Sequence, residues 1–355
     1  ISDLRLDFSL SSEFERIKMA IEHHAGRDYI ASRGEYLNAM ILANYLGYDF
    51  VDAESGIFFD DAGSLDSAKT YETLDEILSQ HERAVIPGFY GSMPNGTIKT
   101  FSRGGSDITG SIVARALCAS IYENWTDVSG MLMADPRCVE NPKVIETITY
   151  KELRELSYMG ATVMHEDAIF PVREACIPIN IRNTNIPTDK GTMIVPSTDE
   201  INGVITGVAG KVGFSTISIE KDMMNAELGV GRRVLEVLEK HKVSFEHFPS
   251  GIDTMTVVVA TDQIDKIRDE ITADLFKSVH ADSVMIEDGL ALIAIVGRGM
   301  VKAKGTAAKV FSAISEAGIN IRMIDQGSSE LNIIIGVDEG DYEAALNAIY
   351  KGFDN

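Results

Sequence analysis

The sequence predicts an α/β protein in which a mostly parallel sheet is sandwiched by helices and is followed by two smaller α+β units. Strand patterns alternate with helix patterns up to about residue 194, which is typical of a parallel sheet. A polar segment rich in Pro, Ser, Asp and Gly then marks a boundary at 196–203. Beyond it the apolar pattern repeats. We therefore expect a first domain over 1–195 and two related units over 203–280 and 281–355.

The beginning of the chain predicts helices with short strands between them. An amphipathic helix is expected over 11–24, and a second one begins at Arg33 and ends at Gly47. Glu35 then falls in a first helical turn, where its carboxylate either complements the helix dipole or is a counter-charge for a ligand ammonium group. The position of Glu35 alone favours the first role, in which its carboxylate complements the helix dipole. Further elements are expected as strands over 48–51 and 57–59 and a helix over 71–78.

A glycine-containing stretch from Phe101 to Gly110 is the strongest candidate for a ligand site. Ser106 or Asp107 is expected to cap the helix that follows it. Free amide groups at the start of a helix, beside the charge of Arg103, suit a carboxylate or a phosphate. The alternative is an ordinary turn before a capped helix.

The neighbouring strands predict where this ligand lies. A buried strand is expected over 84–89, and a hairpin over 96–100 leads into the glycines. A strand over 119–125 places Thr126 and Asp127 just past its end. Ligands gather at the carboxyl ends of the strands in such sheets, so both polar stretches occupy the same type of position.

The remainder of the first domain carries weaker signals. Asp135 and Arg137 lie in a loop from which the arginine can reach a phosphate, although such a sequence more often forms only a turn. Helices are expected over 150–159 and 161–175, and a strand over 178–183.

The repeat beyond the boundary is specific. Adding 76 to each position superposes Ser215–Val259 on Ala291–Ile335 without a gap, so that Gly229 falls on Gly305. Each copy reads strand, glycine loop, helix, strand, turn, strand, which indicates two copies of one small fold. The chain has no P-loop, and its two GxG turns lack the third glycine of a dinucleotide motif.

Composition narrows the choice of partners and compartment. A formal charge of −22 over 355 residues argues against nucleic acid and anionic membranes as partners. No apolar run approaches the roughly 18 residues of a membrane-spanning helix. The cysteines, Cys118, Cys138 and Cys176, show no paired spacing, so we expect a cytoplasmic protein. The chain starts at Ile1 within a helical pattern, and an N-terminal segment is expected to be missing.

Several motifs occur in the order and spacing of aspartate kinases. They are Ser32–Glu35, Val85–Phe89, Ser102–Asp107, Trp125–Gly130, Ala134–Arg137 and Met159–His165. The repeat resembles the tandem ACT domains of that family. The resemblance covers nearly the whole chain and implies an amino-acid-kinase fold followed by two ACT units.

The resemblance implies phosphorylation of the side-chain carboxylate of L-aspartate by Mg²⁺-ATP, giving 4-phospho-L-aspartate. It makes Arg103 and Asp107 catalytic and assigns no resident metal site. It places the substrate on Glu35, Arg103, Gly104, Gly105, Ser106 and Asp107. It places the nucleotide on Thr126, Asp127, Asp135, Arg137 and Val163.

The resemblance also implies regulation by a feedback amino acid, lysine or threonine. In the first ACT unit the effector residues are Gly229, Val230, Glu246 and Ser250. The ACT units of this family also form homodimers, and larger assemblies remain open.

Three features depart from the family pattern. The N-terminal Lys-Phe-Gly-Gly loop, whose lysine stabilises the transferring phosphoryl group, is absent from this chain. Leu132 stands where other members have an aromatic residue, and Thr162 where they have lysine, so nucleotide contacts there can differ. Two alternatives therefore remain: a non-catalytic amino-acid sensor, and a kinase of the same fold acting on glutamate.

Overall fold

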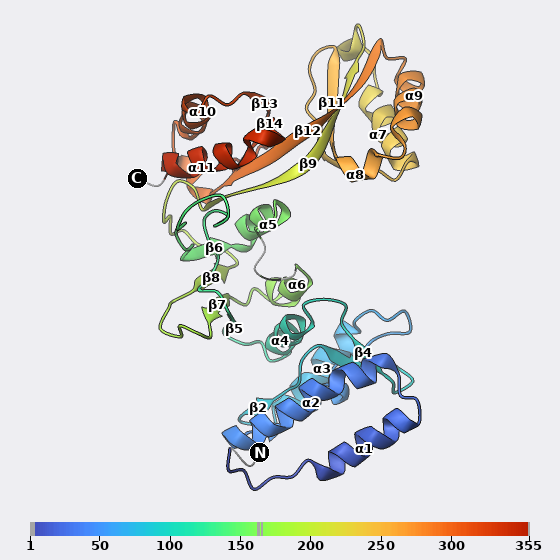
Figure 1. Cartoon of the computed structure of the whole chain (residues 1–355), viewed down its shortest axis with the longest axis vertical. Helices are drawn as coiled ribbons and strands as arrows, with labels where there is room; N and C mark the ends of the chain where they lie inside the picture. The colour runs from blue at the N-terminus through green and yellow to red at the C-terminus, as the bar shows by residue number, and fades with distance from the viewer. Residues whose placement is uncertain (1–3, 162–163, 165, 354–355) are drawn as a thin grey trace. The chain divides into compact units, whose positions relative to one another are not determined.

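The computed structural model describes residues 4–161, 164 and 166–353 (Figure 1). Its internal contacts divide the chain into two compact units, residues 1–130 with 163–198 and residues 131–162 with 199–355. Among the described helices we find none with both the length and the apolar character needed to pass through a membrane.

Five α-helices belong to the described part of the first unit. They are α1 (Ser11–Glu22), α2 (Arg27–Leu46), α3 (Ser67–Leu78), α4 (Gly105–Ala116) and α6 (Glu166–Glu174). The prediction that α2 begins at Arg33 is wrong, because the chain becomes helical directly after an extended Gly26. Glu35 therefore lies in the middle of α2, too far from its start to complement the dipole.

The strands of the first unit are short. They are β1 (Asp49–Phe50), β2 (Ala84–Val85), β3 (Tyr90–Ser92), β4 (Ile98–Thr100), β5 (Tyr122–Thr126), β7 (Ile179–Asn183) and β8 (Thr192–Val195). β1 pairs with β2, and β5 with β7, in parallel, whereas β8 is antiparallel to β7 and β3–β4 form the predicted hairpin. The predicted strand at 57–59 forms only isolated bridges, from Phe58 to Ser92 and from Phe59 to Leu65.

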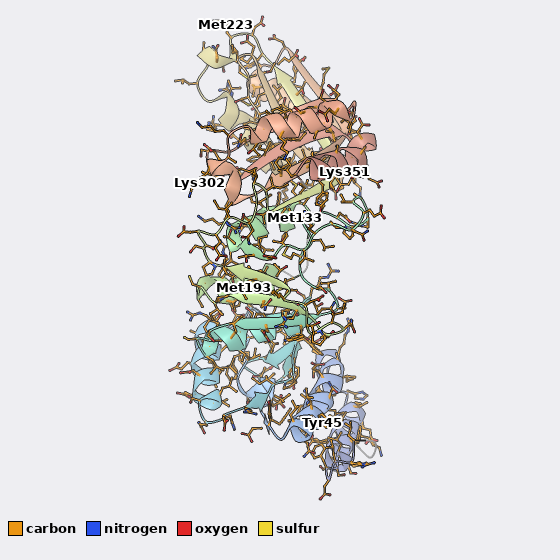
Figure 2. The ribbon with its side chains drawn as sticks, turned by 90° about the vertical axis from the view of Figure 1, so that its left-hand side faces the viewer. Tyr45, Met133, Met193, Met223, Lys302 and Lys351 are labelled. Atoms are coloured by element: carbon orange, nitrogen blue, oxygen red, sulfur yellow. The ribbon has the colours of Figure 1, made fainter. Side chains whose placement is uncertain are left out.

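The second unit is built around one antiparallel sheet in the order β10-β11-β9-β12-β14-β13. Met223 lies at one end of this unit and Met133 near the other (Figure 2). Its strands are β6 (Thr147–Thr149), β9 (Gly207–Glu220), β10 (Phe245–His247), β11 (Thr254–Ala260), β12 (Ser283–Val296), β13 (Ile321–Asp325) and β14 (Asn332–Asp338). Its helices are α5 (Tyr150–Tyr158), α7 (Val230–Lys240), α8 (Thr261–Ile264), α9 (Arg268–Val279), α10 (Thr306–Glu316) and α11 (Tyr342–Phe353). Short 3₁₀ helices occur at Ala53–Ser55 in the first unit and at Met224–Ala226, Arg298–Lys302 and Glu339–Asp341 in the second.

The structure confirms the internal repeat. α7 and α10 begin and end at positions that differ by the predicted offset, and each follows a glycine in the left-handed region, Gly229 (φ 81°) and Gly305 (φ 87°). β10 and β13 likewise begin at equivalent positions, Phe245 and Ile321.

The two repeats exchange halves of their longest strands. β9 and β12 are 14 residues each and pair along most of their length. The start of β9, with Val208, packs in the core of the second repeat, while Val284 and Ile286 of β12 pack against the core of the first. The cores therefore cross the boundary expected at 280, because a strand of this length extends past one small unit and supplies both.

Residues 131–162 also depart from the expected division at 195. Ala134 and Val139 are buried in the core of the second repeat. The Val208 amide donates to the Met133 carbonyl (2.7 Å), and the Lys143 amide donates to Tyr350 Oη (2.9 Å). Apolar burial and these hydrogen bonds attach the segment to the repeats, although it belongs in sequence to the first domain.

Candidate active site

A glycine, not a capping side chain, occupies the start of α4. Gly104 is the N-cap residue in the left-handed region (φ 59°), and no side chain bonds the first-turn amides. The prediction that Ser106 or Asp107 caps this helix is wrong, because both residues lie inside its first turn. The amides of that turn have no partner within the helix and are available to an anion.

Gly105 allows the loop before β3 to pack against α4. A Cβ added at Gly105 would lie 2.5 Å from the Phe89 Cβ and 2.9 Å from its Cα. The Phe89 amide donates to Thr109 Oγ1 (3.0 Å), and the Phe101 amide donates to the Phe89 carbonyl (2.9 Å). The motif at 85–89 thus lies directly beside the glycine motif.

Asp107 is held by a residue that the sequence analysis missed. Asn124 Nδ2 donates to Asp107 Oδ1 (2.8 Å) and to Tyr122 Oη (3.1 Å), and Tyr122 Oη donates to the Asp107 carbonyl (3.2 Å). Burial raises the pKa of Tyr122 to about 12, so its hydroxyl stays protonated at neutral pH. These bonds fix the first turn of α4 to β5. The sequence offered one signal: Tyr122 and Asn124 stand at alternate positions of the predicted strand, which places their side chains on the same face.

The carboxyl end of β5 continues the same surface. Thr126, the last residue of β5, shares a strand face with Asn124 and lies about 7 Å further along. Its Oγ1 donates to Asp127 Oδ1 (3.2 Å), and its carbonyl accepts from the Thr184 amide (2.8 Å). Asp107 therefore contacts the middle of β5, and the Thr126–Asp127 pair lies at the carboxyl end of the same strand.

Glu35 and Arg103 both have side chains available to a ligand. Glu35 is half-buried and Arg103 exposed, and within the described residues neither makes a hydrogen bond or ion pair. The Thr100 amide donates to Asp28 Oδ2 (3.1 Å), which fixes the end of β4 against α2 just before the glycines. Glu35 lies two helical turns from Asp28 on the same face, about 10 Å along the axis.

Arg33 is a buried cation that the sequence analysis did not assign. Its guanidinium carbon lies 4.5 Å from the ring centre of Tyr29 and 4.6 Å from that of Tyr36. Its Nη2 donates to Ser32 Oγ (2.9 Å). Aromatic faces and one hydroxyl compensate for the lost hydration, and they fix the turn of α2 that precedes Glu35. The tyrosines stand four residues before and three after the arginine, a spacing that places all three on one helical face.

The residues expected to contact the nucleotide are divided between the two units. The end of β5 belongs to the first unit, and Asp135 and Arg137 belong to the second. Arg137 donates to the Asp135 carboxylate through its backbone amide (2.8 Å), Nε (3.0 Å) and Nη2 (2.6 Å). Hydrogen bonds from Arg137 lower the pKa of Asp135. The arginine is thus held in one orientation while exposed to solvent. Thr162 and Val163 lie outside the described residues.

Two of the expected effector residues start α7. Gly229 precedes the helix without a capping side chain, and the Val230 side chain is buried in the core of the first repeat, which leaves only its backbone for a ligand. A Cβ added at Gly231 would lie 3.8 Å from Phe248 Cε1 and 3.8 Å from Met255 Cε. The start of α7 therefore lies close to the segment that follows β10.

The other two expected effector residues lie on β10 and in the segment that follows it. Glu246 is on β10, and its Oε2 accepts a hydrogen bond from Tyr158 Oη of α5. Ser250 is exposed and forms an isolated bridge with Met255. The first repeat thus brings the four expected residues to one region. Among the described residues we find no cluster of three or more His, Cys, Asp or Glu side chains that is suited to a metal ion.

Comparison with known proteins identifies the domains. Residues 2–183 match the amino acid kinase family, and residues 293–353 match an ACT domain. The chain is 42% identical to aspartokinase 3 of Bacillus subtilis over 335 residues, which cover 92% of this chain and 74% of that protein.

Solved structures agree with this assignment. The crystal structure of Clostridium acetobutylicum aspartate kinase has a TM-score of 0.90 and 54% identity, covering 99% of this chain and 82% of that one. Aspartokinase III of Escherichia coli in complex with aspartate and ADP has a TM-score of 0.69 and 26% identity, covering 98% and 83%. Its complex with lysine and aspartate has a TM-score of 0.67 at the same identity, covering 92% and 75%.

Proposed function

The chain belongs to the aspartokinases of the amino acid kinase family, and on this premise we propose which of its residues carry the reaction. The reaction is ATP-dependent phosphorylation of the side-chain carboxylate of L-aspartate, which gives 4-phospho-L-aspartate. Feedback by a pathway amino acid acts through the ACT domains.

The substrate binds at the start of α4. Glu35 pairs with the α-ammonium group of aspartate, and Arg103 binds a carboxylate through its planar guanidinium. The first-turn amides of Gly105 and Ser106, beyond the left-handed Gly104, face the negative charge that is shared between donor and acceptor. Phosphoryl transfer between two anions depends on positioning and charge neutralisation, and the donors at this helix start supply both.

One observation supports this assignment above the others. The hydrogen bond from Asn124 to Asp107 (2.8 Å) joins the start of α4 to the strand that ends in Thr126 and Asp127. A substrate at Asp107 and a nucleotide at Thr126 would then lie along the same strand.

The nucleotide binds Thr126, Asp127, Asp135, Arg137 and Val163, with Arg137 on a phosphate. Mg²⁺ arrives with the nucleotide, because Mg²⁺ takes phosphate oxygens and waters with only one or two carboxylates, and the described residues offer no larger acidic cluster. When bound, the ion neutralises phosphate charge. We also propose a cytoplasmic location, because the three cysteines are free thiols.

Turnover tests the substrate site. In the full-length protein, hydroxylamine trapping of the acyl phosphate measures rates with L-aspartate and with L-glutamate. We expect aspartate-dependent turnover that falls at least 100-fold in Arg103→Ala and in Glu35→Ala, because each loses a charged contact to the substrate.

Matched controls are Arg83→Ala and Glu72→Ala, exposed residues of the same unit, and we expect both to retain full turnover. If Arg103→Ala and Glu35→Ala keep wild-type rates, the site assignment is wrong. Turnover with glutamate equal to that with aspartate would instead overturn the specificity for aspartate.

The assembly is a homodimer formed through the ACT repeats. Large apolar side chains are exposed on loops of the first repeat: Met223 (68%), Leu228 (94%) and Ile252 (70%). Exposed apolar groups of this size favour a protein interface. The effector, lysine or threonine, binds the first repeat at Gly229, Val230, Glu246 and Ser250, where Glu246 can accept an ammonium group.

A further inference from the structure

α5 contacts both repeats. Its contact residues are spaced three apart, so each lies about 60° around the helix from the one before it. They are Glu152 and Glu155, bonded to Arg298 and Asn332 of the second repeat, and Tyr158, bonded to Glu246 of the first. α5 thus connects the two repeats to the segment of the kinase domain in which it lies.

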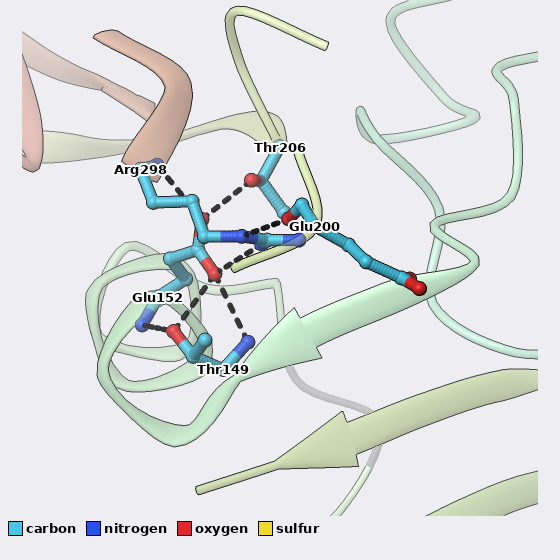
Figure 3. Close-up of polar contacts among 5 residues, drawn as sticks. All are labelled: Thr149, Glu152, Glu200, Thr206 and Arg298. Atoms are coloured by element: carbon cyan, nitrogen blue, oxygen red, sulfur yellow. Dashed lines mark hydrogen bonds and ion pairs between the residues drawn. The ribbon is translucent and has the colours of Figure 1, made fainter. Parts of the chain in front are cut away.

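The N-terminal end of α5 is held by several hydrogen bonds. Glu152 is fully buried and accepts hydrogen bonds from Thr206 Oγ1 (2.6 Å), the Arg298 amide (2.9 Å) and Arg298 Nη1 (2.7 Å) (Figure 3). The Thr149 amide (2.9 Å) and hydroxyl (2.7 Å) add two more bonds in a capping box. A buried carboxylate with this many donors does not exchange partners readily.

At the C-terminal end of α5, where Leu156 and Met159 are buried, one side-chain hydrogen bond among the described residues joins the helix to the first repeat. Tyr158 is 61% exposed, and its hydroxyl donates to Glu246 Oε2. Within the described residues this is the only bond that its side chain makes. Burial and the hydrogen bond to Glu246 raise the pKa of Tyr158 to about 12, so the hydroxyl is a donor at neutral pH. Water competes easily for a contact this exposed.

α5 also lies between two parts of the proposed nucleotide site. The loop with Asp135 and Arg137 precedes it in the chain, and residues 162–163 follow its last turn. In the sequence, Tyr158 at the C-terminal end of α5 therefore stands four and five positions before residues 162 and 163.

We propose that Tyr158 competes with the feedback amino acid for the carboxylate of Glu246. An effector whose ammonium group binds Glu246 displaces the Tyr158 hydroxyl and removes this polar contact between the C-terminal end of α5 and the first repeat, while the Glu152 anchor holds the other end. This inference rests on the proposed effector role of Glu246. Because binding free energies are reciprocal, ATP binding favours the Tyr158–Glu246 contact and opposes the effector.

The substitution Tyr158→Phe distinguishes a hydroxyl that competes with the effector from one that helps to form the effector site. It removes only the hydroxyl and keeps the ring. If the hydroxyl merely supported the site, its loss would weaken effector binding. If it competes, its loss strengthens binding by about fivefold, the value of one typical hydrogen bond. We also expect the KM for ATP to rise by about the same factor, with kcat for aspartate retained.

Binding is measured without substrates, by calorimetric titration of the full-length protein with L-lysine and, separately, with L-threonine. The matched control is Tyr45→Phe, an exposed tyrosine on α2 (Figure 2). We expect the control to bind as the wild type, Tyr158→Phe to bind about fivefold more tightly, and Glu246→Gln to lose binding.

Unchanged or weaker binding by Tyr158→Phe overturns the competition. Wild-type binding by Glu246→Gln, or no binding of either amino acid to the wild type, overturns it as well. The kinase assignment is judged separately, because hydroxylamine trapping with aspartate and ATP does not depend on an effector.

Discussion

Among single residues, Asp107 shows how a side chain proposed to be catalytic depends on a neighbour from another element. The glycine motif predicted Asp107 and Arg103 as site residues. It gave no sign of Asn124, whose Nδ2 lies 2.8 Å from Asp107 Oδ1. The amide is buried on β5, so it holds the carboxylate in one rotamer at little cost in flexibility. In the proposed site, Asn124 is a positioning residue, because it contacts Asp107 and would act on the substrate only through it.

We expect Asn124→Ala to lower kcat by roughly 10-fold while the KM for ATP changes little, since a freed Asp107 loses its orientation but the nucleotide contacts remain. Initial rates over a matrix of aspartate and ATP concentrations measure both constants. Asn44→Ala, at an exposed position of α2, is the control. A rise in the KM for ATP with unchanged kcat would contradict the positioning role.

Among the elements, α5 carries a buried ion pair that joins residues 131–162 to the repeats. Burial by itself raises the pKa of Glu152, but hydrogen bonds from Thr206, from the Arg298 amide and from Thr149 outweigh it and lower the pKa below its usual value. The Glu152–Arg298 ion pair (2.7 Å) is largely shielded from solvent. Removing one partner of such a pair leaves a buried charge without compensation.

Glu152→Gln is therefore expected to destabilise the protein by about 3 kcal/mol at pH 7. The contribution of this carboxylate to the free energy of unfolding is complete above its unfolded pKa of about 4.3. It disappears as the pH falls through the lower pKa of the folded state. Urea unfolding at pH 7 and pH 4 should show a wild type that loses more stability on acidification than the variant does. Glu155→Gln, on the same helix but only partly buried, should cost less than about 1 kcal/mol. Equal losses of unfolding free energy in the two variants would show that Glu152 is not the anchor of this helix.

At the scale of the whole molecule, the repeats share strands and so cannot be separated cleanly. β9 and β12 each supply residues to both cores, and residues 131–162 pack on the second. Continuous strands therefore connect the first repeat to the core that contains Ala134 and Val139, next to Asp135 and Arg137. The repeats and the proposed nucleotide loop are parts of one packed unit.

Leu228→Asp tests the proposed dimer. Placing a carboxylate at a side chain that is 94% exposed in one chain leaves the fold intact but introduces an unpaired charge into an apolar interface. We expect light scattering after gel filtration to give the dimer mass for the wild type and a largely monomeric mass for the variant. Leu42→Asp, on the exposed side of α2, should remain dimeric. A dimer that is unaffected by Leu228→Asp would place the interface elsewhere.

Local sequence patterns determined much of this description. The repeat was visible from its constant offset, and the structure confirms it at the ends of α7 and α10. Glycines and polar residues at the ends of predicted strands identified the region of Asp107 and Thr126. These features depend on residues close in the chain, whose spacing records helical or strand periodicity and turn chemistry.

The partners of these elements were decided only by the tertiary structure. Periodicity shows which face of an element is apolar, but not which distant segment covers it, and therefore the exchange of β9 and β12 between cores was not predicted. The same reason applies to single contacts: Asn124 with Asp107, Arg33 among its tyrosines, and Tyr158 with Glu246 join residues that the chain separates. Such pairings are selected by the free energy of the complete packed state, in which burial and hydrogen bonds across long sequence distances are formed together.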